Sequence, residues 1–186
     1  MENKDKLFGR YNELVLIVIG FILTGVIGNL ITQALQYRDW EFKKTSDIRE
    51  RELNVASSTF EEISKLMDRR LYLSRQLLWA LEANSENIDD KLKDYREVLY
   101  EWNFSLNRNF ALIERYFGNE YRSLFDSKIH GKLMLLNTQL SEYRKGNISQ
   151  LETASKIADS VNVEIFHFNI QMLEKIQNQT VGVNNT

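Results

Sequence analysis

The sequence predicts an all-α protein in which a single N-terminal transmembrane helix continues into an antiparallel bundle of about four long helices. The chain of 186 residues contains no proline, the residue that breaks helices most strongly. One long segment near its start carries no charge, and the rest shows apolar residues at helical spacing. We therefore divide the chain into a flank (1–13), a transmembrane helix (14–37), a soluble bundle (38–178) and a flexible tail (179–186).

The segment from Leu14 to Leu35 has the length and composition of a membrane-spanning helix. At 1.5 Å per residue it spans about 33 Å, which matches the hydrocarbon core of a bilayer. Aromatic residues, which favour the headgroup region, flank it at Phe8, Tyr11, Tyr37, Trp40 and Phe42. The alternatives are a buried core helix and a signal peptide cleaved near Thr32–Ala34, for which the apolar run is long.

More Lys and Arg residues follow this segment than precede it. The positive-inside rule therefore predicts a single-pass protein of the cell membrane with its bundle in the cytoplasm. Three of these cations can contact anionic lipid headgroups, at about 1 kcal/mol each. They are Arg38, Lys43 and Lys44.

The predicted span also carries small and polar residues that repeat along one side. Small side chains let membrane helices approach closely, and an amide such as that of Asn29 needs a partner inside a bilayer. With one span in the chain, the partner must come from another chain, so we expect a homo-oligomer. A pore lined by these residues is a narrower version of this prediction. The residues are Gly20, Thr24, Gly25, Gly28, Asn29, Thr32, Gln33 and Gln36.

Three breaks divide the remaining chain into helices. Polar residues at 84–87 end the first helix, and Gly118 and Gly146 end the second and third, because glycine adopts a positive φ at low cost. The second helix is predicted from about Ile88 to Phe117. Asn119 is predicted to begin the third helix, and the candidate N-caps of the second and fourth are Ser85 or Asn87 and Asn147 or Ser149.

The sequence shows no catalytic centre. Without cysteine it has no thiolate ligand or nucleophile, and no phosphate-binding glycine loop or nucleophile elbow is present. Glu164 and His167 have the spacing of a bundle di-iron ligand pair, but the second pair is missing. We therefore expect no enzyme activity, no cofactor and no metal.

Arginines spaced seven residues apart at Arg108, Arg115 and Arg122 could bind an anionic small molecule such as a nucleotide. The alternative is a solvated helix face whose arginines pair with nearby glutamates. Two further basic clusters are Arg69, Arg70 and Arg75, and Lys128, His130 and Lys132. The net charge of −2 argues against a nucleic acid partner.

Two functional classes remain. The first is a membrane-anchored scaffold that self-associates through its transmembrane helix and docks a protein partner. The second is an effector gated by a ligand or partner, in which the bundle senses a signal and the membrane helix forms a pore or disturbs the bilayer. Antiviral defence in bacteria is one context for such an architecture, by analogy alone.

Overall fold

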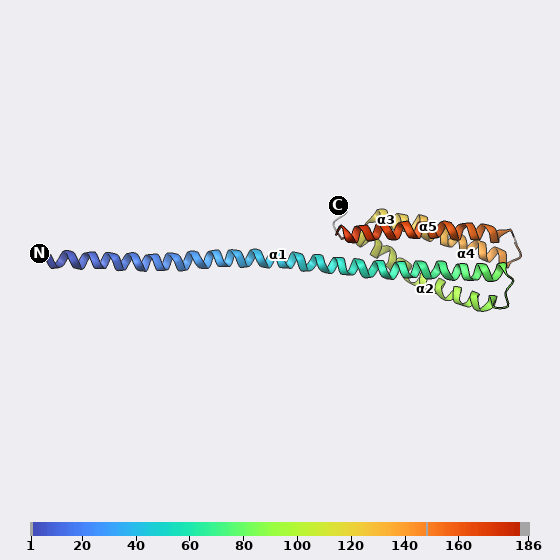
Figure 1. Cartoon of the computed structure of the whole chain (residues 1–186), viewed down its shortest axis with the longest axis horizontal. Coiled ribbons are helices and arrows are strands. Elements are labelled where there is room, and N and C mark those ends of the chain that lie inside the picture. The colour runs from blue at the N-terminus through green and yellow to red at the C-terminus, as the bar shows by residue number, and fades with distance from the viewer. Residues whose placement is uncertain (1, 148, 183–186) are drawn as a thin grey trace. The chain divides into compact units, whose positions relative to one another are not determined.

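The computed structural model describes the backbone of residues 2–147 and 149–182, and the side chains of residues 20, 21, 25, 29–147 and 149–182. Every element of this part is helical, so the all-α prediction is confirmed for it (Figure 1). The elements are α1 (Glu2–Glu82), α2 (Ile88–Phe117), α3 (Asn119–Leu124), the π-helical η1 (Phe125–His130), α4 (Gly131–Arg144) and α5 (Gln150–Gln177).

The chain divides into two compact units, Met1–Arg49 and Glu50–Thr186. In the first unit, the described side chains of α1 are exposed almost throughout. Among residues with described side chains, we find no helix whose length and hydropathy together suit a membrane crossing. Much of the predicted span at 14–37 lies outside those residues, and the span stays a prediction.

The second unit is an antiparallel bundle of four helical rods, counted over its described residues, with α3, η1 and α4 forming the third rod. Ion pairs and hydrogen bonds between rods give their directions. Residues 62 and 69 of α1 pair with 108 and 101 of α2, in reverse order. Residues 95 and 102 of α2 pair likewise with 137 and 130 of the third rod, and residues 64 and 75 of α1 with 169 and 159 of α5.

The core of the bundle follows the apolar spacing of its helices. In α5, apolar spacing predicts an inward face from Leu151 to Ile176; its two end residues are only half-buried, and the six between them are buried, namely Ala154, Ala158, Val161, Ile165, Phe168 and Met172. In α2, apolar spacing predicts Leu99 and Leu106 on the inward face, but both are only half-buried. Val98 and Asn109 are buried instead, so the buried face is turned slightly around the helix. The largest fully buried side chains include Trp102, Phe117 and Phe125, at the junction of α2 with the third rod.

The helix breaks lie where the sequence predicts them. α1 ends at Glu82, α2 has the predicted bounds, and Gly118 and Gly146 have φ near +103° and +104°, a region that side chains rarely adopt. The predicted capping hydrogen bonds are not formed. Asn87 and Ser149 precede α2 and α5 but make no side-chain cap bond. Each instead binds within its loop: Ser85 Oγ donates to Asn87 Oδ1 at 2.7 Å, and Ser149 Oγ donates to Asn147 Oδ1 at 2.9 Å.

The π-helical segment η1 was not predicted from the sequence. Leu124 and Gly131, on either side of it, keep α-helical dihedral angles, so the rod continues through it. A π turn widens the helix and shifts the side chains that follow. Here Phe125 and Ile129 are both buried in the core, and His130 lies against Trp102 of α2.

Candidate functional site

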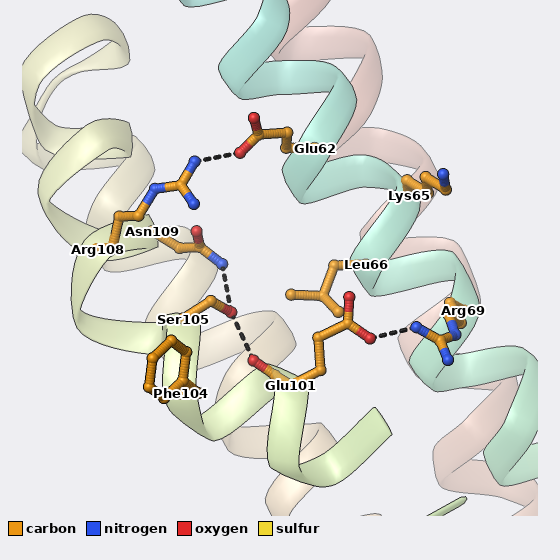
Figure 2. Close-up of a pocket in the computed structure, with 9 residues that line it drawn as sticks. All are labelled: Glu62, Lys65, Leu66, Arg69, Glu101, Phe104, Ser105, Arg108 and Asn109. Atoms are coloured by element: carbon orange, nitrogen blue, oxygen red, sulfur yellow. Dashed lines mark hydrogen bonds and ion pairs between the residues drawn. The ribbon is translucent and has the colours of Figure 1, made fainter. Parts of the chain in front are cut away.

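The bundle carries a groove between α1 and α2, with a volume of about 500 Å³ (Figure 2). This volume lies within the usual range of small-molecule sites. Both helices supply acidic, basic and apolar side chains to the groove, and α2 also supplies an uncharged serine and asparagine. The lining residues are Glu62, Lys65, Leu66, Arg69, Glu101, Phe104, Ser105, Arg108 and Asn109.

Two crossed ion pairs bridge the groove. Arg69 of α1 binds Glu101 of α2, and Arg108 of α2 binds Glu62 of α1. Each helix thus presents a glutamate and, seven residues later, an arginine, and the antiparallel packing brings each arginine to the other helix's glutamate. All four side chains are about half exposed, so each pair contributes at most about 1 kcal/mol to stability.

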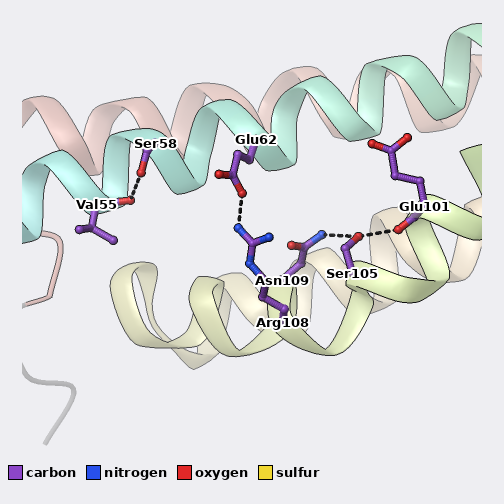
Figure 3. A network of polar contacts seen from close by, with 7 residues as sticks. All are labelled: Val55, Ser58, Glu62, Glu101, Ser105, Arg108 and Asn109. Carbon is purple, nitrogen blue, oxygen red and sulfur yellow. Dashed lines mark hydrogen bonds and ion pairs between the residues drawn. The ribbon is translucent and has the colours of Figure 1, made fainter.

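Between the ion pairs lies a polar relay on α2, drawn in Figure 3. Ser105 Oγ donates to the Glu101 carbonyl oxygen at 2.8 Å, and Asn109 Nδ2 donates to Ser105 Oγ at 3.3 Å. Asn109 is buried, whereas the ring of Phe104 is almost fully exposed. Within the described residues no carboxylate pairs with Lys65. The groove therefore has one cation more than its carboxylates neutralise.

The three arginines predicted to bind an anion do not converge on this groove. Only Arg108 lines it. Arg115 lies 3.5 Å from Glu52, and Arg122 lies 3.5 Å from Glu114 with its guanidinium over the ring of Phe110. Each arginine thus has a glutamate partner, as expected if this is a solvated helix face and not an anion-binding site. The sequence reasoning missed Arg69 and Lys65 as groove residues, although the shared spacing of Glu62–Arg69 and Glu101–Arg108 was a usable signal.

Arg70 does not belong to a surface cluster with Arg69 and Arg75, as the sequence suggested. Its side chain is only 2% exposed, and its Nε and Nη1 atoms have no hydrogen-bond partner. The guanidinium carbon lies 4.5 Å from the centre of the Trp102 ring, a cation–π contact. Burial lowers the pKa of Arg70 to about 10, so the group keeps its charge at neutral pH.

No buried anion near Arg70 neutralises it among the described residues. The phenol of Tyr95 is close enough to Arg70 to interact with it electrostatically, and it would stabilise the guanidinium if it were ionised. Burial, however, raises the pKa of Tyr95 to about 12, so the hydroxyl stays protonated. It donates to Asn137 Oδ1 at 3.1 Å. Burying an unpaired cation is costly, because the protein interior solvates charge poorly. Arg70 is therefore a buried cation whose desolvation cost no anion among the described residues offsets.

His130 completes this cluster. Trp102 Nε1 donates to His130 Nδ1 at 3.2 Å, and the two rings stack with an angle of 6° between their planes. Burial, and after it the positive charge of Arg70 on α1, lower the pKa of His130 below its usual 6.5, while Asp126 on η1 acts in the opposite direction. The acceptor role of Nδ1 also requires that this nitrogen carry no proton.

This geometry predicts an acid-sensitive bundle. The folded pKa of His130 lies below its unfolded value, so the folded state binds this proton less well, and stability falls as the pH drops from 6.5 to the folded pKa. Unfolding by urea, followed at pH 7.5 and at progressively lower pH, should show this loss. His130→Gln keeps an acceptor for Trp102 and should flatten the profile over this range, whereas His167→Gln should not; equal profiles for all three proteins would contradict the prediction.

The Glu164–His167 pair is not placed as a metal site. Lys132 Nζ donates to Glu164 Oε1 at 2.7 Å, and this hydrogen bond lowers the pKa of Glu164. The same Nζ also donates to Ser160 Oγ. Among the described residues no group of three or more His, Asp or Glu side chains could hold a metal ion. Lys132 and Lys128 therefore both lie near Glu164, whereas His130 contacts Trp102 instead.

The residues predicted to face a membrane partner lie in the first unit. Asn29, Thr32, Gln33 and Gln36 are exposed, and a Cβ atom added at Gly20 or Gly25 would meet nothing within 4 Å. Thr24 and Gly28 lie in α1, outside the residues whose side chains and surroundings the structure describes. The three predicted headgroup contacts, Arg38, Lys43 and Lys44, are exposed, and Lys44 Nζ lies 5.0 Å from the ring centre of Trp40.

We compared the chain with protein-family models, with curated proteins and with solved structures, and none of the three comparisons found a match.

Proposed function

We propose that this protein is a membrane-anchored helical scaffold that self-associates through its N-terminal helix and presents its bundle, on the cytoplasmic side, to a protein partner. The observation that carries this proposal is the uncharged stretch from Leu14 to Leu35 with amides along one side. An amide in a bilayer's interior costs free energy unless a hydrogen-bond partner satisfies it.

The described side chains support the proposal. Asn29, Gln33 and Gln36 lie exposed on α1, so their own chain leaves them accessible to a second helix. The space beside Gly20 and Gly25 would admit a close helix approach. In this scheme Arg38, Lys43 and Lys44 contact headgroups next to the anchor, and the chain needs neither a cofactor nor catalysis.

Gly28→Ile should lower the associated fraction of full-length protein in lipid vesicles by about tenfold, because it adds bulk where two helices approach. Energy transfer between labelled copies, at fixed protein-to-lipid ratio, measures this. Leu30→Phe is the control, since Leu30 lies about 160° around the helix from Gly28 at 100° per residue, and added bulk there should leave association unchanged. A wild-type protein that stays monomeric at every ratio, or that alkaline extraction removes from membranes, would overturn the proposal.

The effector alternative makes use of the same polar side chains, and one result separates the two functions. Only an effector depolarises cells when it is expressed together with its activating signal. In that case Asn29→Leu and Gln33→Leu should suppress the depolarisation, because they remove the polar lining that water or ions require. An unchanged membrane potential leaves the scaffold as the function.

A further inference from the structure

Helix α5 carries a second apolar stripe, separate from the face that it buries in the core. Its members, which we call the outer stripe, are Val163, Phe166, Ile170 and Leu173, and they are 37–61% exposed. At 100° per residue, the outer stripe lies about 140° around the helix from the buried face formed by residues such as Val161, Ile165 and Phe168. A helix that served the bundle alone would carry polar residues there.

The spacing of the outer stripe is that of a coiled-coil seam. Steps of three, four and three residues separate its members, so Val163 and Ile170 occupy the a positions of a heptad and Phe166 and Leu173 the d positions. In parallel coiled coils, β-branched residues at a combined with leucine at d favour two strands. We propose that the outer stripe packs against the outer stripe of a second copy of this chain, with the two α5 helices parallel.

The residues beside the seam agree with this arrangement. In a parallel pair, each g position lies next to the partner's following e position. Asn162 would thus face the partner's His167. The half-buried Asn169, whose Nδ2 donates to Ser64 Oγ within its own chain, would lie beside the partner's Glu174, so no like charges meet. Asp159, at the d position before Val163, binds Arg75 at 2.8 Å within its own chain and ends the seam, and Gln177 ends it on the other side.

The seam is short, about three helical turns, and isolated helices of that length associate weakly. Association should therefore be strongest where copies are already concentrated, because a tether converts the second contact into an intramolecular one. That enhancement rests on the proposed membrane anchor, whereas the pairing geometry does not. The two contributions can be measured separately.

The chain has no cysteine, which makes single-cysteine crosslinking a direct test. In a parallel pair a positions face each other, so full-length Val163→Cys and full-length Ile170→Cys in lipid vesicles should each form a disulfide with an identical copy on mild oxidation. Glu97→Cys, on the exposed surface of α2, is the control and should not. Crosslinks that form only between Val163→Cys and Leu173→Cys chains would show an antiparallel pair, and absence of crosslinks at both a positions would also overturn the proposal.

A second set of variants separates this contact from the membrane one. Adding Phe166→Glu to Ile170→Cys should lower the crosslink yield about tenfold, since a charge enters an apolar seam. Far-UV circular dichroism should be unchanged because Phe166 is exposed. If Phe166→Glu has no effect while Gly28→Ile abolishes the crosslink, the outer stripe is no interface; if Phe166→Glu abolishes it and Gly28→Ile does not, the stripe pairs without the membrane helix.

Discussion

Replacing Trp102 by alanine is expected to lower the free energy of unfolding of the bundle by about 3–5 kcal/mol. The indole is 1% exposed, and its ring centre lies 5.6 Å from that of Phe125. Its removal leaves a cavity at the junction of α2 and the third rod, takes the donor from His130 Nδ1, and takes the aromatic face from Arg70. Urea titration of the full-length protein in detergent, followed by circular dichroism, measures the loss.

Trp79 offers a matched control, since it is another tryptophan but is 55% exposed on α1. Trp79→Ala should change stability by no more than about 0.5 kcal/mol, the usual range for surface sites. Trp102→Phe should fall between the two, because it keeps much of the volume but loses the N–H. If Trp102→Ala and Trp79→Ala cost the same, the Arg70–Trp102–His130 cluster does not organise the core.

The sequence predicted the elements of the bundle well because their signals are local. The bounds of α2 and the inward face of α5 follow from apolar spacing, and the ends at Gly118 and Gly146 follow from the freedom of glycine at positive φ. The missing cap hydrogen bonds were beyond this reasoning, since Asn87 and Asn147 accept bonds from serines inside their own loops instead. Loop hydrogen bonds of this kind compete with capping on nearly equal terms.

The candidate site was less predictable because it depends on contacts between distant residues. Arg69 and Arg70 are adjacent in sequence, yet one forms an exposed ion pair and the other is buried against Trp102. The two roles depend only on how α1 is rotated about its axis relative to α2. A prediction of that rotation that is wrong by one residue exchanges the two arginines. The π turn at Phe125–His130 likewise has no signal in composition; it brings His130 against Trp102, a contact that spacing alone does not reveal.

Arg70→Met should raise the free energy of unfolding of the bundle by about 1–4 kcal/mol. Methionine has a similar length and can fill the same space beside Trp102, while it removes a buried cation whose Nε and Nη1 have no partner. The cation–π contact at 4.5 Å contributes about 2 kcal/mol at a buried site, which offsets only part of the cost of desolvating the guanidinium. The same urea titration measures the gain.

Arg69→Met is the control, because it removes a neighbouring arginine whose ion pair with Glu101 is half exposed; its effect should stay within about 1 kcal/mol. A loss of stability in Arg70→Met would mean that the stack on Trp102 outweighs desolvation. The double variant with Trp102→Ala then decides the cause, since residues in contact show non-additive effects. If desolvation dominates, Arg70→Met should stabilise the Trp102→Ala protein even more than the wild type, because that protein's guanidinium has lost its aromatic partner as well.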